Sequence, residues 1–195
     1  MTGPALAALL AVALAGIGRT APPAPAAEVP RPPEPSAAEV RKRIEAFLGS
    51  IDTPIRPSQW QALGPGAIPV LKELATSPDQ FPPHRARAVD GLAAIGGLEA
   101  QGTVLGLVRS ESEPFAVRAA ALRAAGRMLP PDRLLPVIRP VLEAPGPARA
   151  RAVAAEVLAR HAGEAGCAAV RARVAKEAPE EREVFHHAEA ACEKK

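Results

Sequence analysis

Two cysteines are the residues of this chain whose type and placement are best suited to covalent chemistry. Cys167 and Cys192 are the only cysteines in the 195-residue sequence, and Ala178-Pro179 between them predicts a turn between two antiparallel helices. In such a hairpin the two positions lie level, which suits the Cα separation of about 4.4–6.8 Å that a disulfide needs. We therefore expect a Cys167–Cys192 disulfide, which would contribute about 3 kcal/mol in the loop-entropy model. Two small buried thiols are the alternative interpretation.

The four histidines do not form a metal-binding pattern. His186 and His187 are neighbours, so they point about 100° apart on a helix and cannot both face one metal ion. His84 and His161 stand far from them in the sequence, and no carboxylate accompanies any histidine at ligand spacing. The sequence also lacks a glycine-rich phosphate loop, a Gly-x-Ser-x-Gly elbow and paired inward carboxylates. We expect a non-enzymatic protein that holds no metal and no other cofactor.

An alanine-rich stretch that recurs at a regular interval predicts the architecture. Arg85, Arg118 and Arg151 are evenly spaced, and each opens a stretch whose apolar positions have helical spacing. A second apolar series interleaves with the first, at Val70, Val104, Val137 and Val170. Two helical faces that recur together with a period of about 33 residues predict an all-α fold, an α-solenoid of about four stacked antiparallel helix pairs. The first helices of the pairs are expected near 66–77, 100–110, 132–143 and 164–177, and the second helices near 84–96, 115–129, 148–162 and 181–192.

The solenoid is expected to span residues 36–195 and to begin with a capping helix. Ser36 and Glu39 are spaced as in a capping box, and apolar residues at helical spacing follow them. This helix suits the open first face of a solenoid. Trp60, the only tryptophan, belongs to a short helix near residues 58–64. We expect it to pack beneath the cap, and a binding anchor is the alternative.

Residues 1–26 are interpreted as a signal peptide. The apolar run Ala5–Ile17 would reach about 20 Å as a helix, which is shorter than the hydrocarbon core of a bilayer. Small-x-small cleavage sites end at Ala15 and Ala26, although no Lys or Arg precedes the run. We therefore expect an exported protein, periplasmic or secreted, which meets a membrane only if this segment is not cleaved. A mobile apolar tail or a misassigned start codon is the alternative.

A proline-rich segment follows the apolar run. Residues 21–35 contain seven prolines, so residues 27–35, beyond the second cleavage site, are expected to be an extended linker. A ligand for an aromatic groove is the alternative. The net charge of the whole chain is only +3, and aromatic residues make up 3% of it. These values do not point to nucleic acid as a partner.

The repeated units resemble HEAT repeats, most closely the short class first described in phycobilisome lyases. The resemblance covers about residues 58–192 and rests on stretches such as Ala67–Ala75 followed by Arg85–Gly96. It implies that an acid in each turn and an arginine of the second helix bond between neighbouring repeats. Two such pairs match, Asp79 with Arg85 and Glu113 with Arg118, whereas the third turn lacks a well-placed acid. The arginine column Arg85, Arg118 and Arg151 is accordingly interpreted as structural, with ligand binding as the alternative.

The resemblance also implies that the second helices line a concave face. Helical spacing opposite their apolar stripe selects the candidate partner-binding residues Asp90, Arg123, Arg127, Glu156 and Arg160. We expect a scaffold or adaptor of the cell envelope that binds a protein partner there, and a plain solvated face is the alternative. Nucleic-acid binding, as in helical-repeat DNA glycosylases, is the alternative function if the N-terminus is not an export signal. A lyase or chaperone role would rest on fold resemblance alone.

Overall fold

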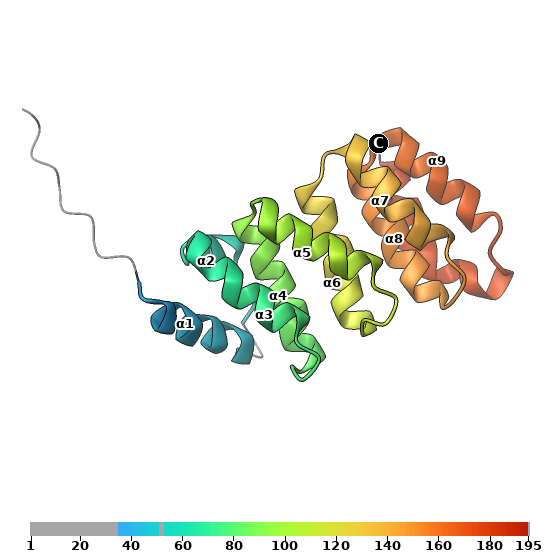
Figure 1. The fold of residues 1–195 in the computed structure, drawn as a ribbon. Helices are drawn as coiled ribbons and strands as arrows, with labels where there is room; N and C mark the ends of the chain where they lie inside the picture. Colours follow the sequence, from blue (N-terminus) through green and yellow to red (C-terminus); the bar gives the residue numbers. More distant parts are fainter. Residues whose placement is uncertain (1–34, 51–52, 195) are drawn as a thin grey trace, which may run out of the picture. The chain divides into compact units, whose positions relative to one another are not determined.

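The computed structural model describes residues 35–50 and 53–194, and every regular element within them is a helix (Figure 1). Pro35–Lys195 form one compact unit. The expected signal peptide, residues 1–26, and all of the expected linker except Pro35 lie outside the described residues.

The first helix, α1 (Ala37–Gly49), begins at the expected capping box. The Ser36 side chain accepts a hydrogen bond from the Glu39 amide at 3.3 Å, and the Glu39 carboxylate accepts one from the Ser36 amide at 2.8 Å. These bonds hold the pKa of Glu39 below its usual value, chiefly through the backbone amide of Ser36. The buried face of α1, which includes Ile44, packs toward α4 and a short 3₁₀ turn, η1 (Pro65–Ala67).

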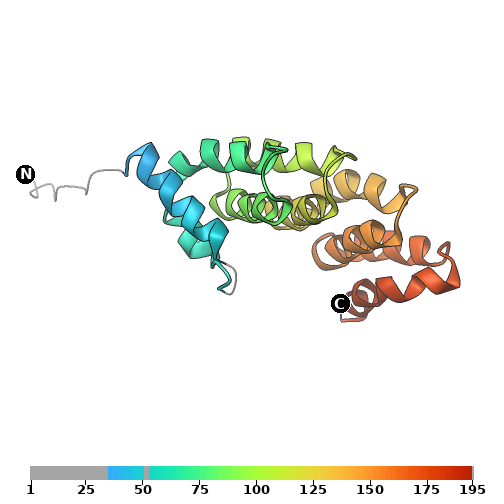
Figure 2. The same ribbon diagram turned by 90° about the horizontal axis from the view of Figure 1, so that it is seen from below.

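Four antiparallel helix pairs follow, which confirms the predicted α-solenoid. The pairs are α3 (Ile68–Thr76) with α4 (Pro82–Ile95), α5 (Leu98–Arg109) with α6 (Phe115–Met128), α7 (Pro131–Glu143) with α8 (Ala148–His161), and α9 (Gly163–Val174) with α10 (His186–Glu193). Each helix contacts its counterpart in the next pair, so α3, α5, α7 and α9 form one layer and α4, α6, α8 and α10 the other. In Figure 2, α1 and the C-terminal helices turn toward the side of α4, α6 and α8, so the second helices form the inner face.

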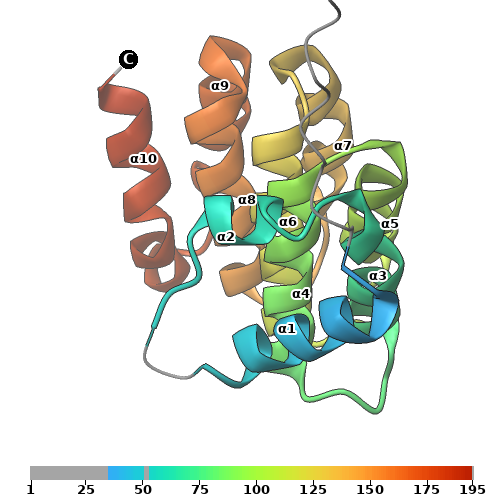
Figure 3. The same cartoon turned by 90° about the vertical axis from the view of Figure 1, so that its left-hand side faces the viewer.

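Trp60 closes the first end of the array. It lies in α2 (Pro57–Gln61), which packs on α4 in the position of a preceding second helix, and Figure 3 shows α1 and α2 from this end. The indole is 3% exposed and meets the Phe47 ring edge-on, with centroids 5.0 Å apart. It also lies against Gly91 of α4, where a Cβ atom would come within 2.9 Å of the Trp60 ring. Glycine at this position therefore allows the close packing of α2 on α4.

The last pair is less regular than the three before it. The expected helix 181–192 begins instead as a 3₁₀ segment, η2 (Pro179–Phe185), and becomes α-helical only at His186. A disulfide joins Cys167 of α9 to Cys192 of α10, with Cα atoms 5.5 Å apart. Phe185, which is fully buried, fills the space where η2 meets α10. The disulfide and this aromatic side chain fix the irregular end of the array.

Candidate functional site

The first arginine of the column, Arg85, joins the first helix pair to the second. Arg85 is buried, and its Nε donates to the carbonyl oxygen of Ala75 at 2.9 Å. Its Nη2 forms an ion pair with Glu113, in the turn of the following pair. The bond between neighbouring repeats therefore runs forward along the chain, from Arg85 to Glu113, and not to Asp79 in the turn that precedes Arg85.

The third arginine of the column holds two carboxylates. Arg151 donates to both oxygens of Glu177, from Nε at 2.7 Å and from Nη2 at 2.6 Å, and to Glu181 at 3.1 Å. Arg173 adds a bond to Glu177 at 2.8 Å. The hydrogen bond from Arg151 is the main cause that lowers the pKa of Glu177 to about 2, and the pKa of Arg151 is raised in turn. Glu177 was not predicted from the sequence, although Arg151 needs an acidic partner and Glu177 lies in the turn that follows α9.

Arg118, the middle arginine, has no such partner. Its Nε lies 3.4 Å from the carbonyl oxygen of Val108, and no carboxylate of the described residues forms an ion pair with it. The third turn, residues 143–147, lacks an acid at the required position, as the sequence indicated. The pairing with Glu113 that the resemblance implied for Arg118 is wrong, because Glu113 bonds to Arg85.

The five predicted partner-binding residues lie on the second helices α4, α6 and α8. Asp90 and Arg127 form an ion pair at 2.6 Å that joins α4 to α6, with about half of each side chain exposed. Glu156 and Arg160 pair within α8 at 2.7 Å. Arg123 is exposed on α6, one turn before Arg127. The structure thus joins Asp90 with Arg127, and Glu156 with Arg160, but it does not gather all five into one cluster.

An open cavity of about 390 Å³ lies at the α2 end of this face. Its lining residues are Ile55, Pro57, Trp60, Gln61, Asp90, Ala93, Ala94 and Arg127. Trp60 and the exposed Asp90–Arg127 ion pair therefore line the same cavity. The cavity has an apolar part for a hydrophobic side chain and, beside it, a carboxylate and a guanidinium for polar groups.

Comparison with known proteins matches residues 68–159 to the HEAT repeats family. The chain therefore contains HEAT repeats. The matched residues extend from the start of α3 to within two residues of the end of α8. No curated protein and no solved structure matches the chain.

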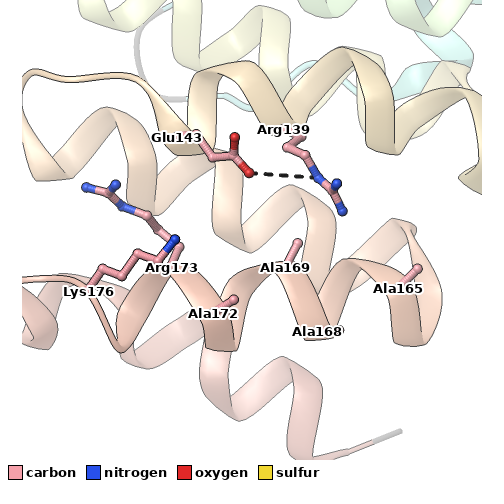
Figure 4. A pocket seen from close by; sticks show the side chains of 8 residues that line it. All are labelled: Arg139, Glu143, Ala165, Ala168, Ala169, Ala172, Arg173 and Lys176. Carbon is pink, nitrogen blue, oxygen red and sulfur yellow. Dashed lines mark ion pairs between the residues drawn. The ribbon is translucent and has the colours of Figure 1, made fainter.

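A second cavity of this HEAT-repeat protein lies in the layer of first helices, between α7 and α9 (Figure 4). Its volume is about 460 Å³, and alanines of α9, among them Ala165 and Ala172, form one wall. Arg139 and Glu143 of α7 approach each other at 4.0 Å on one side of the cavity, and Lys176 lies at the end away from Ala165. This cavity was not predicted from the sequence, although the alanines at helical spacing along α9 indicate a surface without large side chains.

Two other features, a metal-binding cluster and a membrane-spanning helix, are not found in the described part of the chain. There, no group of three or more His, Cys, Asp or Glu side chains is arranged to hold a metal ion. Among the same residues, no helix combines the length and the hydropathy needed to cross a membrane.

Proposed function

We propose that this HEAT-repeat protein is a non-enzymatic adaptor of the cell envelope. It would bind a protein partner on the exposed side of α4, α6 and α8, which we call the second-helix face. The observation that carries the proposal is the half-exposed Asp90–Arg127 ion pair, which joins α4 to α6 and lines the cavity beside α2. Arginine is among the residues that most often dominate binding energy in protein interfaces, and Arg127 is about half exposed beside the apolar lining of this cavity. HEAT repeats commonly serve as protein-interaction scaffolds, and their stacked helices give a rigid extended surface.

The charges of this face favour a protein over a nucleic acid. Arg127 and Arg160 are each engaged by a carboxylate of the same face, Asp90 and Glu156 respectively. A surface that binds phosphates would keep several cations available and would bring aromatic rings to stack on bases. A strip of mixed sign instead complements the mixed charges of another protein surface.

Two features support action outside the cytoplasm. The apolar run Ala5–Ile17 has the length of a signal-peptide core. The Cys167–Cys192 disulfide would persist in an oxidising compartment, such as a periplasm or the extracellular space. The intact mass of protein alkylated without reduction in its native host tests this part of the proposal. A shortened chain without alkylated cysteine supports export, and a full-length chain with two alkylated cysteines contradicts it.

A pair of charge reversals tests the binding face. Arg123→Glu changes an exposed residue of α6 on the second-helix face, whereas Arg133→Glu changes an exposed residue of α7 in the other layer. Both variants should keep the helical circular dichroism of the wild type, because both side chains are solvated. We expect Arg123→Glu to reduce capture of an envelope protein from the native host, and Arg133→Glu to capture as much as the wild type. Equal capture by both variants would contradict the proposed face.

A further inference from the structure

The unpaired Arg118 lies at an open cavity of about 420 Å³ on the edge of the array, where α5 and α7 meet the start of α6. Arg118 and Arg109 line it together with Glu111, and apolar groups of α7, among them Val137 and Val141, form the opposite wall. The charged side chains carry two positive charges and one negative charge. Among the described residues, neither arginine forms an ion pair.

The repeat itself shows which group is missing from this cavity. Arg151 occupies the position of Arg118 one repeat later, and its carboxylate partner Glu177 follows Ala144 by the same interval. Ala144 lines the cavity at Arg118. The cavity at Arg118 therefore lies at the position where, one repeat later, the Glu177 carboxylate binds Arg151.

Arg118 is oriented to receive such a group. Its Nε faces the carbonyl oxygen of Val108 on the preceding helix, just as the Nε of Arg85 faces that of Ala75. In Arg85 this arrangement leaves Nη2 to bind the carboxylate of Glu113 from the next turn. The same contact at Arg118 leaves its Nη atoms for a carboxylate at the equivalent place, and no residue in the described part of the chain supplies one.

We propose that this cavity binds an aspartate or glutamate side chain of an acidic peptide segment in a protein partner. The carboxylate would accept hydrogen bonds from Arg118 in the way that Glu177 accepts them from Arg151. Apolar residues beside that acid would contact Val137, Val141 and the exposed prolines of α7, Pro136 and Pro140. This site lies apart from the Trp60 cavity and does not depend on the function proposed for the second-helix face.

Nuclear magnetic resonance of the ¹⁵N-labelled full-length chain tests the site with a defined probe. The Nε–Hε signal of Arg118, assigned by its absence in Arg118→Gln, is followed while acetyl-Val-Glu-Val-amide is added. Acetyl-Val-Gln-Val-amide is the neutral control, and acetyl-Val-Gln-Val with a free carboxyl terminus tests the other source of a carboxylate. Ala144→Glu supplies an internal carboxylate, and Ala144→Gln has the same length without the charge.

The predicted result is a saturable shift of the Arg118 signal with the glutamate peptide, and none with the neutral peptide. Ala144→Glu should weaken binding of the glutamate peptide about tenfold or more, because the new carboxylate already occupies Arg118. Ala144→Gln should bind the peptide as the wild type does. The proposal is overturned if the glutamate peptide produces no saturable shift on the wild type, or if only the peptide with the free carboxyl terminus does. Undiminished binding to folded Ala144→Glu would also overturn it.

Discussion

Arg151 and Glu177 form a bidentate ion pair with both side chains almost completely buried. The pair joins the start of α8 to the turn after α9, and Arg173 satisfies Glu177 from a second direction. A buried carboxylate held by two guanidinium groups is strongly destabilising if one partner is lost, because the remaining charges stay desolvated. The packing of the fourth repeat on the third therefore depends on this pair.

Glu177→Gln should destabilise the protein markedly. Removing one partner of a buried ion pair costs about 3–5 kcal/mol, and the amide keeps part of the hydrogen bonding, so we expect a loss of about 2–4 kcal/mol. Glu181→Gln is the matched control, because Glu181 also contacts Arg151 but has 42% of its side chain exposed. Urea unfolding followed by circular dichroism measures both. Equal midpoints for the two variants would show that burial of the pair is not what stabilises this end.

The same carboxylate should make the protein sensitive to acid. The pKa of Glu177 is about 2 in the folded protein against 4.5 as the ordinary value, so the folded state binds the proton less readily. Its contribution to the free energy of unfolding is complete above about pH 5 and is lost as the pH falls towards 2, by at most about 3 kcal/mol. The stability difference between wild type and Glu177→Gln, measured by urea unfolding, should therefore shrink from pH 6 to pH 2.5. A constant difference would contradict the lowered pKa.

Gly91→Ala should destabilise the N-terminal end. A Cβ at this position would lie 2.9 Å from the rigid Trp60 ring and 3.1 Å from Leu71, and overpacking of this kind costs about 1–3 kcal/mol. The gain in helix propensity offsets at most about 1 kcal/mol, so the net change should be a loss. Gly102→Ala in α5, whose added Cβ meets nothing within 4 Å, should instead raise the melting temperature. A rise for Gly91→Ala as well would show that α2 does not pack tightly on α4.

Reduction of the disulfide should weaken the C-terminal end. Cys167 and Cys192 are 25 residues apart, and a cross-link over a loop of this size stabilises by about 3 kcal/mol in the loop-entropy model. The melting temperature of the wild type should fall on addition of a reductant. The double variant Cys167→Ser/Cys192→Ser should already melt at the lower temperature and should not respond. If the melting temperature of the wild type did not change on addition of the reductant, the disulfide would not be stabilising.

The regular part of the fold was predictable from the sequence because local signals repeat in it. The even spacing of Arg85, Arg118 and Arg151 predicted the helix pairs, and Ser36 with Glu39 predicted the start of α1. The last pair was harder to predict, because the residues from Pro179 to Phe185 favour an α-helix but form a 3₁₀ helix. Glu177 was missed because its pairing with an arginine of the preceding repeat depends on how two repeats stack.

The candidate site was less predictable than the fold. Helical spacing placed Asp90 and Arg127 on one face, but their pairing across α4 and α6 depends on the distance between two helices. The cavities depend on small side chains meeting between elements, as Ala93 and Ala94 do beside Trp60. Such contacts follow from three-dimensional packing and leave little trace in the periodicity of one helix.

Photo-cross-linking in the native host tests the proposed adaptor face most directly. Benzoylphenylalanine is introduced at position 123, on the second-helix face, and in a separate strain at position 133, in the other layer. The proposed function predicts a cross-link of defined mass to an envelope protein from position 123, and none to that protein from position 133. Cross-links to a protein only from position 133, or to no protein from position 123, would contradict a partner-binding role for the second-helix face.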